Sequence, residues 1–197
     1  MDDLSLLYAL AVFAFVGSVT PGPNNMMLMA SGANFGIRRT IPHLLGVSVG
    51  HSFQVFCVGV GLAGIFDVLP WAEPTLKAIC LVYLFWLAWR IAQAASPDGS
   101  RGKGRPMTFF EAAAFQWVNP KAWALSLTAV STYAPGDSIG AMAAVALTFS
   151  TVNLPSVGIW TWLGQAIRRW LDGPGRLRAF NWTMAILLVA STIPVLF

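Results

Sequence analysis

Charged side chains are scarce over long stretches of this sequence, and their spacing constrains the fold more than any other feature. Of the 197 residues, 10 % are charged and 56 % are hydrophobic, whereas soluble domains average about 25 % charged residues. A helix crosses a bilayer core about 30 Å thick with roughly 20 apolar residues. The stretches nearly free of charge therefore predict an all-α membrane protein with six transmembrane helices, at 4–30, 41–66, 74–95, 108–133, 139–165 and 179–197.

The basic residues indicate how such a protein is oriented. Ten of the 12 Lys and Arg residues fall around the links after the first, third and fifth predicted spans. Cytoplasmic loops carry an excess of Lys and Arg, so we expect these links in the cytoplasm and both termini in the periplasm. The alternation explains the net charge of +4 without nucleic-acid binding. Met1-Asp2-Asp3 lacks the basic region of a cleaved signal peptide, so the first span is expected to be retained.

A segment rich in Gly, Ser and charges divides the chain at its middle. Residues 96–107 are predicted to form a cytoplasmic linker, because Ser96–Gly104 offers little that could pack. Three spans precede it in residues 1–95, and three follow in residues 108–197. Halves with three crossings each must run in opposite directions. The sequence therefore predicts two inverted three-helix repeats, a layout common among secondary transporters.

Two predicted spans, the first and the fourth, contain helix-breaking proline motifs. Non-helical backbone at membrane depth is tolerated only against other protein or a wet cavity. We therefore expect both helices to be interrupted, and their breaks to meet near the middle of the membrane, where transporters bind their substrates. A packing kink is the alternative for each motif. The predicted substrate-binding residues are Pro21, Gly22, Pro23, Asn24, Asn119, Pro120 and Lys121.

Lys121 is the most conspicuous of these residues. A lysine at the centre of a span costs at least about 2.5–3.5 kcal/mol on insertion scales, and no Asp or Glu lies deep in any predicted span. Its partners must be main-chain carbonyls, side-chain amides, water or an anionic group of the ligand. Two hypotheses follow: Lys121 binds the carboxylate of a small substrate, or it only ties the two broken helices together.

Three more polar residues could belong to the same cavity. His51 has the only deep side chain whose ordinary pKa lies near neutrality, so it is a candidate proton carrier, although a lone histidine is more often a hydrogen-bonded interior residue. Gln54 follows it by one helical turn, and Asn153 lies 99 residues beyond Gln54. These residues could face one another across the repeat axis, or Asn153 could serve only a kink at Pro155. His43 is expected to be structural.

Other residue types predict little chemistry. Cys57 and Cys80 lie in apolar runs without a C-x-x-C spacing, so no disulfide, metal or redox site is expected. No H-E-x-x-H motif is present, the two histidines are isolated and no carboxylate lies deep in a predicted span, so we expect neither an enzyme nor a cofactor. Gly46 and Gly50 are expected to allow close helix packing in lipid.

The motifs together resemble the LysE/RhtB family of amino-acid exporters. The resemblance rests on Thr-Pro-Gly-Pro-Asn at 20–24 and Asn-Pro-Lys at 119–121, with glycines at 36, 46 and 50. Residues 84–90 and 127–133 are most similar to the cysteine/O-acetylserine exporter branch. The resemblance implies export of amino acids or their derivatives across the bacterial inner membrane by proton antiport, with the two motifs at the site.

The predicted function is a secondary transporter that exports a small neutral amino acid or derivative by alternating access. A neutral substrate is favoured because the second span lacks an acidic residue for a cationic side chain. The alternative is a passive channel or a structural membrane subunit. The expected partners are the substrate, the lipid bilayer and protons. Whether the chain forms a homo-oligomer is left open by the sequence.

Overall fold

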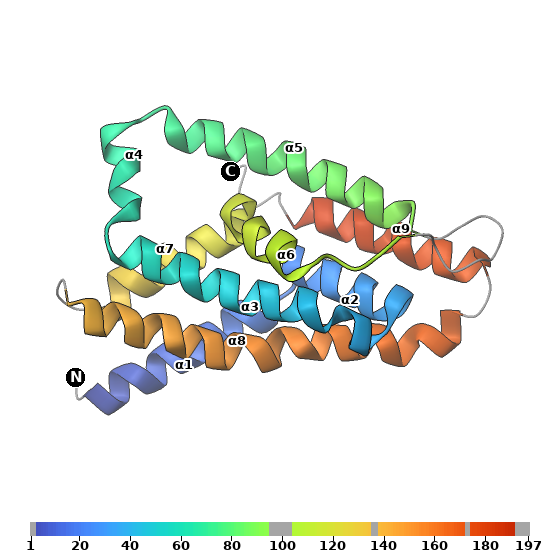
Figure 1. The fold of residues 1–197 in the computed structure, drawn as a ribbon, viewed down its shortest axis with the longest axis horizontal. Coiled ribbons are helices and arrows are strands. Elements are labelled where there is room, and N and C mark those ends of the chain that lie inside the picture. Colours follow the sequence, from blue (N-terminus) through green and yellow to red (C-terminus); the bar gives the residue numbers. More distant parts are fainter. Residues whose placement is uncertain (1–2, 95–103, 135–137, 172–173, 192–197) are drawn as a thin grey trace.

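Every regular element in the described part of the chain is a helix, which confirms the predicted all-α class there. The computed structural model describes residues 3–94, 104–134, 138–171 and 174–191 (Figure 1). Its elements are α1 (Asp3–Val19), α2 (Pro23–Phe35), α3 (Ile37–Gly59), η1 (Leu62–Gly64), α4 (Ile65–Val68), α5 (Ala72–Ala92), α6 (Phe109–Phe115), η2 (Gln116–Val118), α7 (Pro120–Tyr133), α8 (Ile139–Ile167), η3 (Arg168–Leu171) and α9 (Pro174–Ala190).

Three of these helices are long and apolar enough to cross a membrane: α3, α5, and α8 with its extension η3. Helices α1 and α2, bent by 57° at their junction, qualify as a fourth span if they are counted together. Among the described residues, α6, α7 and α9 do not qualify by length and composition, and residues 192–197 of the last predicted span lie outside that range. Six crossings therefore stay a prediction.

The second predicted span, 41–66, has the wrong boundaries. Helix α3 begins earlier, at Ile37, and ends at Gly59. It starts before residue 41 because a helix can extend beyond its charge-free stretch, and Arg38 and Arg39 in its first turn are exposed. It ends early because Gly61 adopts a φ of 104°, a left-handed conformation that a helix cannot continue through and that glycine tolerates.

The helices run back and forth along the long axis of the molecule (Figure 1). The first pair, α1 and α2, runs from the N-terminal end to the opposite end, and α3 returns beside it. Helix α8 packs against all three of these helices, α3 packs against α6 and α7, and α5 packs on α9. The junction between α1 and α2 therefore lies against α8, and the junction between α6 and α7 lies against α3.

Glycines allow the closest helix contacts, as predicted for Gly46 and Gly50. A Cβ on Gly46 would lie 2.3 Å from the carbonyl oxygen of Phe109 in α6, and one on Gly50 would lie 2.5 Å from Cα of Ala113. A Cβ on Gly164 of α8 would lie 2.1 Å from the main-chain oxygen of Met29 in α2. These positions have no room for any side chain.

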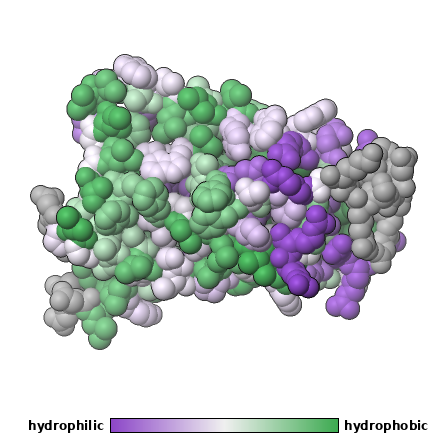
Figure 2. Space-filling view, viewed as in Figure 1, coloured by the Kyte–Doolittle hydropathy of each residue, from purple (hydrophilic) through white to green (hydrophobic). Residues whose placement is uncertain are grey.

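Hydrophilic side chains gather at one end of the molecule. Figure 2 shows them at the end where α2 meets α3 and α5 finishes, while hydrophobic side chains cover most of the remaining face. Exposed large side chains such as Leu4, Val82 and Ile186 fit a lipid-facing surface. We call the hydrophilic end the basic end, because the helix termini located there carry Arg38, Arg39, Arg90, Arg168, Arg169, Arg176 and Arg178.

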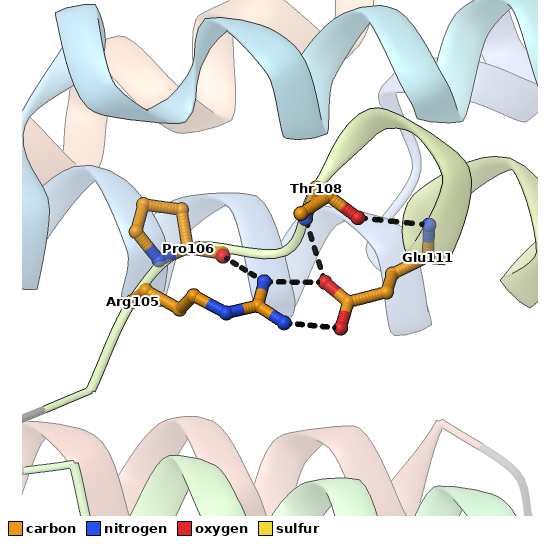
Figure 3. Close-up of polar contacts among 4 residues, drawn as sticks. All are labelled: Arg105, Pro106, Thr108 and Glu111. Atoms are coloured by element: carbon orange, nitrogen blue, oxygen red, sulfur yellow. Dashed lines mark hydrogen bonds and ion pairs between the residues drawn. The ribbon is translucent and has the colours of Figure 1, made fainter.

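The end of the predicted linker is held in place at the basic end. Residues 96–103 lie outside the described residues, and Gly104–Met107, which we call the strap, leads into α6. The Arg105 guanidinium donates two hydrogen bonds of 2.6 Å to the Glu111 carboxylate (Figure 3). Thr108 caps α6 in a reciprocal capping box with Glu111, an arrangement that satisfies two unpaired donors of the first turn.

Candidate functional site

The first break separates α1 from α2 and leaves main-chain carbonyls without helical donors. Pro21 and Pro23 carry no N–H, so they cannot donate to the preceding turn. Side chains supply donors instead. The Asn25 Nδ2 donates to the oxygens of Ser18, at 2.9 Å, and of Thr20, at 2.7 Å.

Two residues far along the chain complete this set of donors. The Trp160 indole donates to the oxygen of Val19 at 3.2 Å. The Lys121 ammonium donates to the oxygens of Thr20, at 2.6 Å, and Pro21, at 3.4 Å. The four carbonyls from residue 18 to residue 21 therefore all accept hydrogen bonds from side chains, and helices α7 and α8 take part in holding the break.

The second break lies between α6 and α7. The chain passes through η2 and reaches Asn119, whose extended backbone (φ −101°, ψ 104°) interrupts the helix. The Asn119 side chain then caps α7 by accepting a hydrogen bond from the Lys121 N–H at 3.2 Å, and Pro120 occupies the first turn, where its missing N–H costs nothing. A new helix N-terminus is thus created beside Lys121.

The two breaks meet. A Cβ built on Gly22 would lie 2.8 Å from Cδ and 3.1 Å from Nζ of Lys121, so a side chain at this position would have to displace the Lys121 side chain. Residues from both breaks line one small cavity of about 20 Å³, which is room for about one water molecule. Its lining residues are Gly17, Ser18, Gly22, Pro23, Asn24, Asn25, His51, Asn119, Lys121, Ala122, Leu125, Asn153 and Val157. We call this the central cavity.

Five of the seven predicted substrate-binding residues line the central cavity. Pro21 is exposed beside it and presents its carbonyl to Lys121, and Pro120 is part-buried in the first turn of α7. His51 and Asn153 also line the cavity, whereas Gln54 does not. The Gln54 amide instead donates to the main-chain oxygen of Gln116 at 3.1 Å.

Gln116 is a central residue that the sequence analysis missed. Its side chain is 0 % exposed and pairs reciprocally with Asn24: Asn24 Nδ2 donates to Oε1 at 2.8 Å, and Gln116 Nε2 donates to Oδ1 at 3.1 Å. The pair links the two broken helices across 92 residues of sequence. An amide in an otherwise apolar run, three residues before Asn119, was the available signal.

Ser18 is a second residue of the central cavity that the sequence analysis did not identify. Its hydroxyl accepts a hydrogen bond from Asn153 Nδ2 at 2.9 Å. The His51 ring lies edge-on to Phe149, with 5.2 Å between ring centres. Within the described residues, His51 Nε2 and the Asn153 Oδ1 are buried without a hydrogen-bond partner, so the wall of the central cavity holds unused polar atoms.

The electrostatics of the central cavity favour an anion. Lys121 contributes a positive charge, and no carboxylate is among the lining residues. The N-termini of α2 and α7, of 13 and 14 residues, both lie at this cavity. Unpaired N–H groups give a helix N-terminus a partial positive charge. The arrangement can therefore bind a carboxylate, and in the described residues no three His, Cys, Asp or Glu side chains gather to hold a metal.

Comparisons with known proteins extend over nearly the whole chain. A family model described as LysE type translocator matches residues 15–196. The cysteine/O-acetylserine efflux protein of Escherichia coli (strain K12) is 27 % identical over 198 residues, covering 98 % of each chain. The protein of the same name from Shigella flexneri is 27 % identical over 197 residues, again 98 % of each chain. No solved structure matches the chain.

Proposed function

Because the chain belongs to the LysE type translocator family, as its motifs indicated, we propose that it exports a small neutral amino acid or a derivative of one. The curated relatives are named for the efflux of cysteine and O-acetylserine, which carry small, uncharged side chains. The central cavity lacks a carboxylate that could balance a cationic side chain. These two observations favour a neutral zwitterion over lysine or arginine as the substrate.

The substrate carboxylate binds Lys121 in this proposal. The observation that carries it is that, in the described residues, the Lys121 ammonium is hydrogen-bonded to the uncharged main-chain carbonyls of Thr20 and Pro21, at the point where two helix N-termini converge. A carboxylate forms stronger, charge-assisted hydrogen bonds than a carbonyl does. It would therefore displace these carbonyls and be stabilised by the N-termini of α2 and α7.

Transport by alternating access is supported by the packing of the two halves. Helix α8 packs on both pieces of the first broken helix, and α3 packs on both pieces of the second. In addition, α3 packs on α8 and α5 on α9. A two-fold axis relating inverted repeats would produce these matched contacts. The central cavity of about 20 Å³ is too small for an amino acid, so the halves must move apart before substrate binds.

Proton coupling would use His51. Its buried Nε2 has no partner among the described residues, and its side chain shares the central cavity with Lys121. The exported amino acid and an incoming proton could therefore use the same site in alternation. The basic end is the cytoplasmic side in this proposal, and both termini are periplasmic in the inner membrane.

Inverted membrane vesicles test the function directly. Uptake of labelled cysteine, O-acetylserine, serine, threonine and leucine is measured with and without an imposed pH gradient. We expect uptake of at least one small neutral amino acid, driven by protons leaving the vesicle lumen. Equal uptake with and without the pH gradient would rule out proton antiport. Preloaded substrate accelerates uptake through a carrier and not through a channel, so absence of counterflow would favour the channel alternative.

A further inference from the structure

A second, larger cavity of about 340 Å³ lies at the basic end. It is bounded by α2, the start of α3, the end of α5, the strap and the first turn of α6. Its volume falls within the range of small-molecule sites, about 300–1,000 Å³. The central cavity holds about one water in the same conformation. Of these two cavities, this one, which we call the outer cavity, is large enough for an amino acid.

His43 is the residue of the outer cavity that lacks a partner. Its side chain is 2 % exposed, and both ring nitrogens are buried without a hydrogen bond among the described residues. Other polar groups of the wall are paired: the Ser31 hydroxyl with Thr40 at 2.9 Å, and the Asn34 amide reciprocally with Asn181. Buried polar groups left unpaired are costly. A histidine with a purely structural role would be hydrogen-bonded to other protein groups. His43 has no such partner among the described residues, and a bound molecule could supply the hydrogen bond.

Charges of both signs line the same cavity. The Arg90 guanidinium lies 5.0 Å from the ring centre of Trp86, and Arg105 and Glu111 form their ion pair on the strap side. Apolar side chains, including Met27 and Met107, line the rest. Cationic, anionic and apolar groups together match the carboxylate, ammonium and small side chain of a neutral amino acid.

The outer cavity lies next to the central cavity along two helices. On α2, Asn24 lines the central cavity and Met27 the outer one, a separation of about one helical turn. On the other broken helix, Glu111 lines the outer cavity and Asn119 the central one. The Asn24–Gln116 amide pair links the two helices at the edge of the central cavity.

We propose that the outer cavity is a second amino-acid-binding site, occupied before the substrate reaches Lys121, with His43 as a residue that hydrogen-bonds the ligand. This proposal rests on the proposed function as an exporter. It accounts for a conformation in which the central cavity is closed while a cavity of suitable size stays open at the basic end.

Binding to the purified full chain in lipid nanodiscs tests the proposal. The probes are the same five labelled amino acids, and the background is Lys121→Met, which disables the central site. We expect this variant to keep binding a probe. Adding His43→Leu should weaken that binding about tenfold, because one polar partner is lost, while His43→Gln should keep it within about threefold.

A cavity-filling variant guards against simple misfolding of the histidine variants. Gly104 lines the outer cavity and a Cβ there would meet only Phe35 Cζ, at 3.6 Å, so Gly104→Trp is chosen to place an indole ring at this cavity. Gly64→Trp is the matched control, because nothing lies within 4 Å of a Cβ there and it is far from the cavity. Only Gly104→Trp should reduce binding.

The possible failures are distinguishable. The second site is overturned if Lys121→Met binds none of the probes, or if neither His43→Leu nor Gly104→Trp changes the binding. Either result leaves the proposed transport by the wild type intact. Wild-type protein that transports none of the probes, yet binds one in a His43-dependent manner, would reject the exporter and support the site. Neither binding nor transport would reject both.

Discussion

At the residue scale, one cation organises the centre of the molecule. Lys121 reaches across from α7 to the carbonyls of Thr20 and Pro21, and Gly22 leaves the space that this reach needs. The hypothesis that Lys121 only ties the helices together describes the same contacts without substrate. The two hypotheses therefore differ in what happens to these hydrogen bonds when a carboxylate is present, and not in the structure without one.

The Asn24–Gln116 pair offers a prediction at the same scale. Replacing Gln116 with Leu removes both amide hydrogen bonds and leaves the Asn24 amide unpaired, so we expect a loss of about 1–3 kcal/mol in the free energy of unfolding. Denaturant unfolding in detergent measures it. In the double variant with Asn24→Leu no amide is orphaned, so its loss should be smaller than the sum of the two single losses. Additive losses would contradict an interaction between the two side chains.

At the element scale, sequence and structure can be compared residue by residue. Pro21, Pro23 and Lys121 could be predicted as residues of the two breaks because each is costly in an apolar helix whatever surrounds it. Gln116 and Ser18 could not, since a buried amide or hydroxyl gains its role from the helix packed against it. The end of α3 was misplaced for a related reason: hydropathy continues past Gly59, whereas the turn depends on the conformation of Gly61.

The close packing of α2 on α8 gives a prediction with a control on the same helix. Gly164→Ala places a Cβ about 2.1 Å from the Met29 oxygen, and such overpacking costs about 1–3 kcal/mol. Gly158→Ala meets nothing within 4 Å and should stabilise α8 by up to about 1 kcal/mol through helix propensity. Thermal unfolding in detergent compares the two. Equal midpoints would contradict the close approach.

At the scale of the whole molecule, charge separates the two ends. The helix termini at one end carry the arginines, and hydrophobic side chains cover most of the remaining visible face (Figure 2). The central cavity lies where both broken helices are interrupted, away from their outer ends. A polar site enclosed by helices with a lipid-facing exterior is the arrangement that a carrier needs, because the substrate must leave water on one side and return to it on the other.

Orientation of the basic end can be measured with single cysteines. In a background of Cys57→Ala and Cys80→Ala, cysteine replaces either Arg39, exposed at the start of α3, or Ser138, exposed before α8. A membrane-impermeant maleimide should label Ser138→Cys in spheroplasts and Arg39→Cys only in inverted vesicles, because basic segments stay in the cytoplasm. The reverse pattern would place the termini in the cytoplasm.

The most direct test of the account is transport by Lys121→Met in inverted vesicles, compared with Lys77→Met at equal amounts of folded protein. The Lys77 ammonium pairs with Glu73 at 2.8 Å on an exposed surface, so its loss should leave uptake near the wild-type rate. Loss of the Lys121 charge should reduce uptake by at least about 100-fold, as expected when a buried carboxylate loses its charged partner. Wild-type uptake by Lys121→Met would contradict a substrate site at the two breaks.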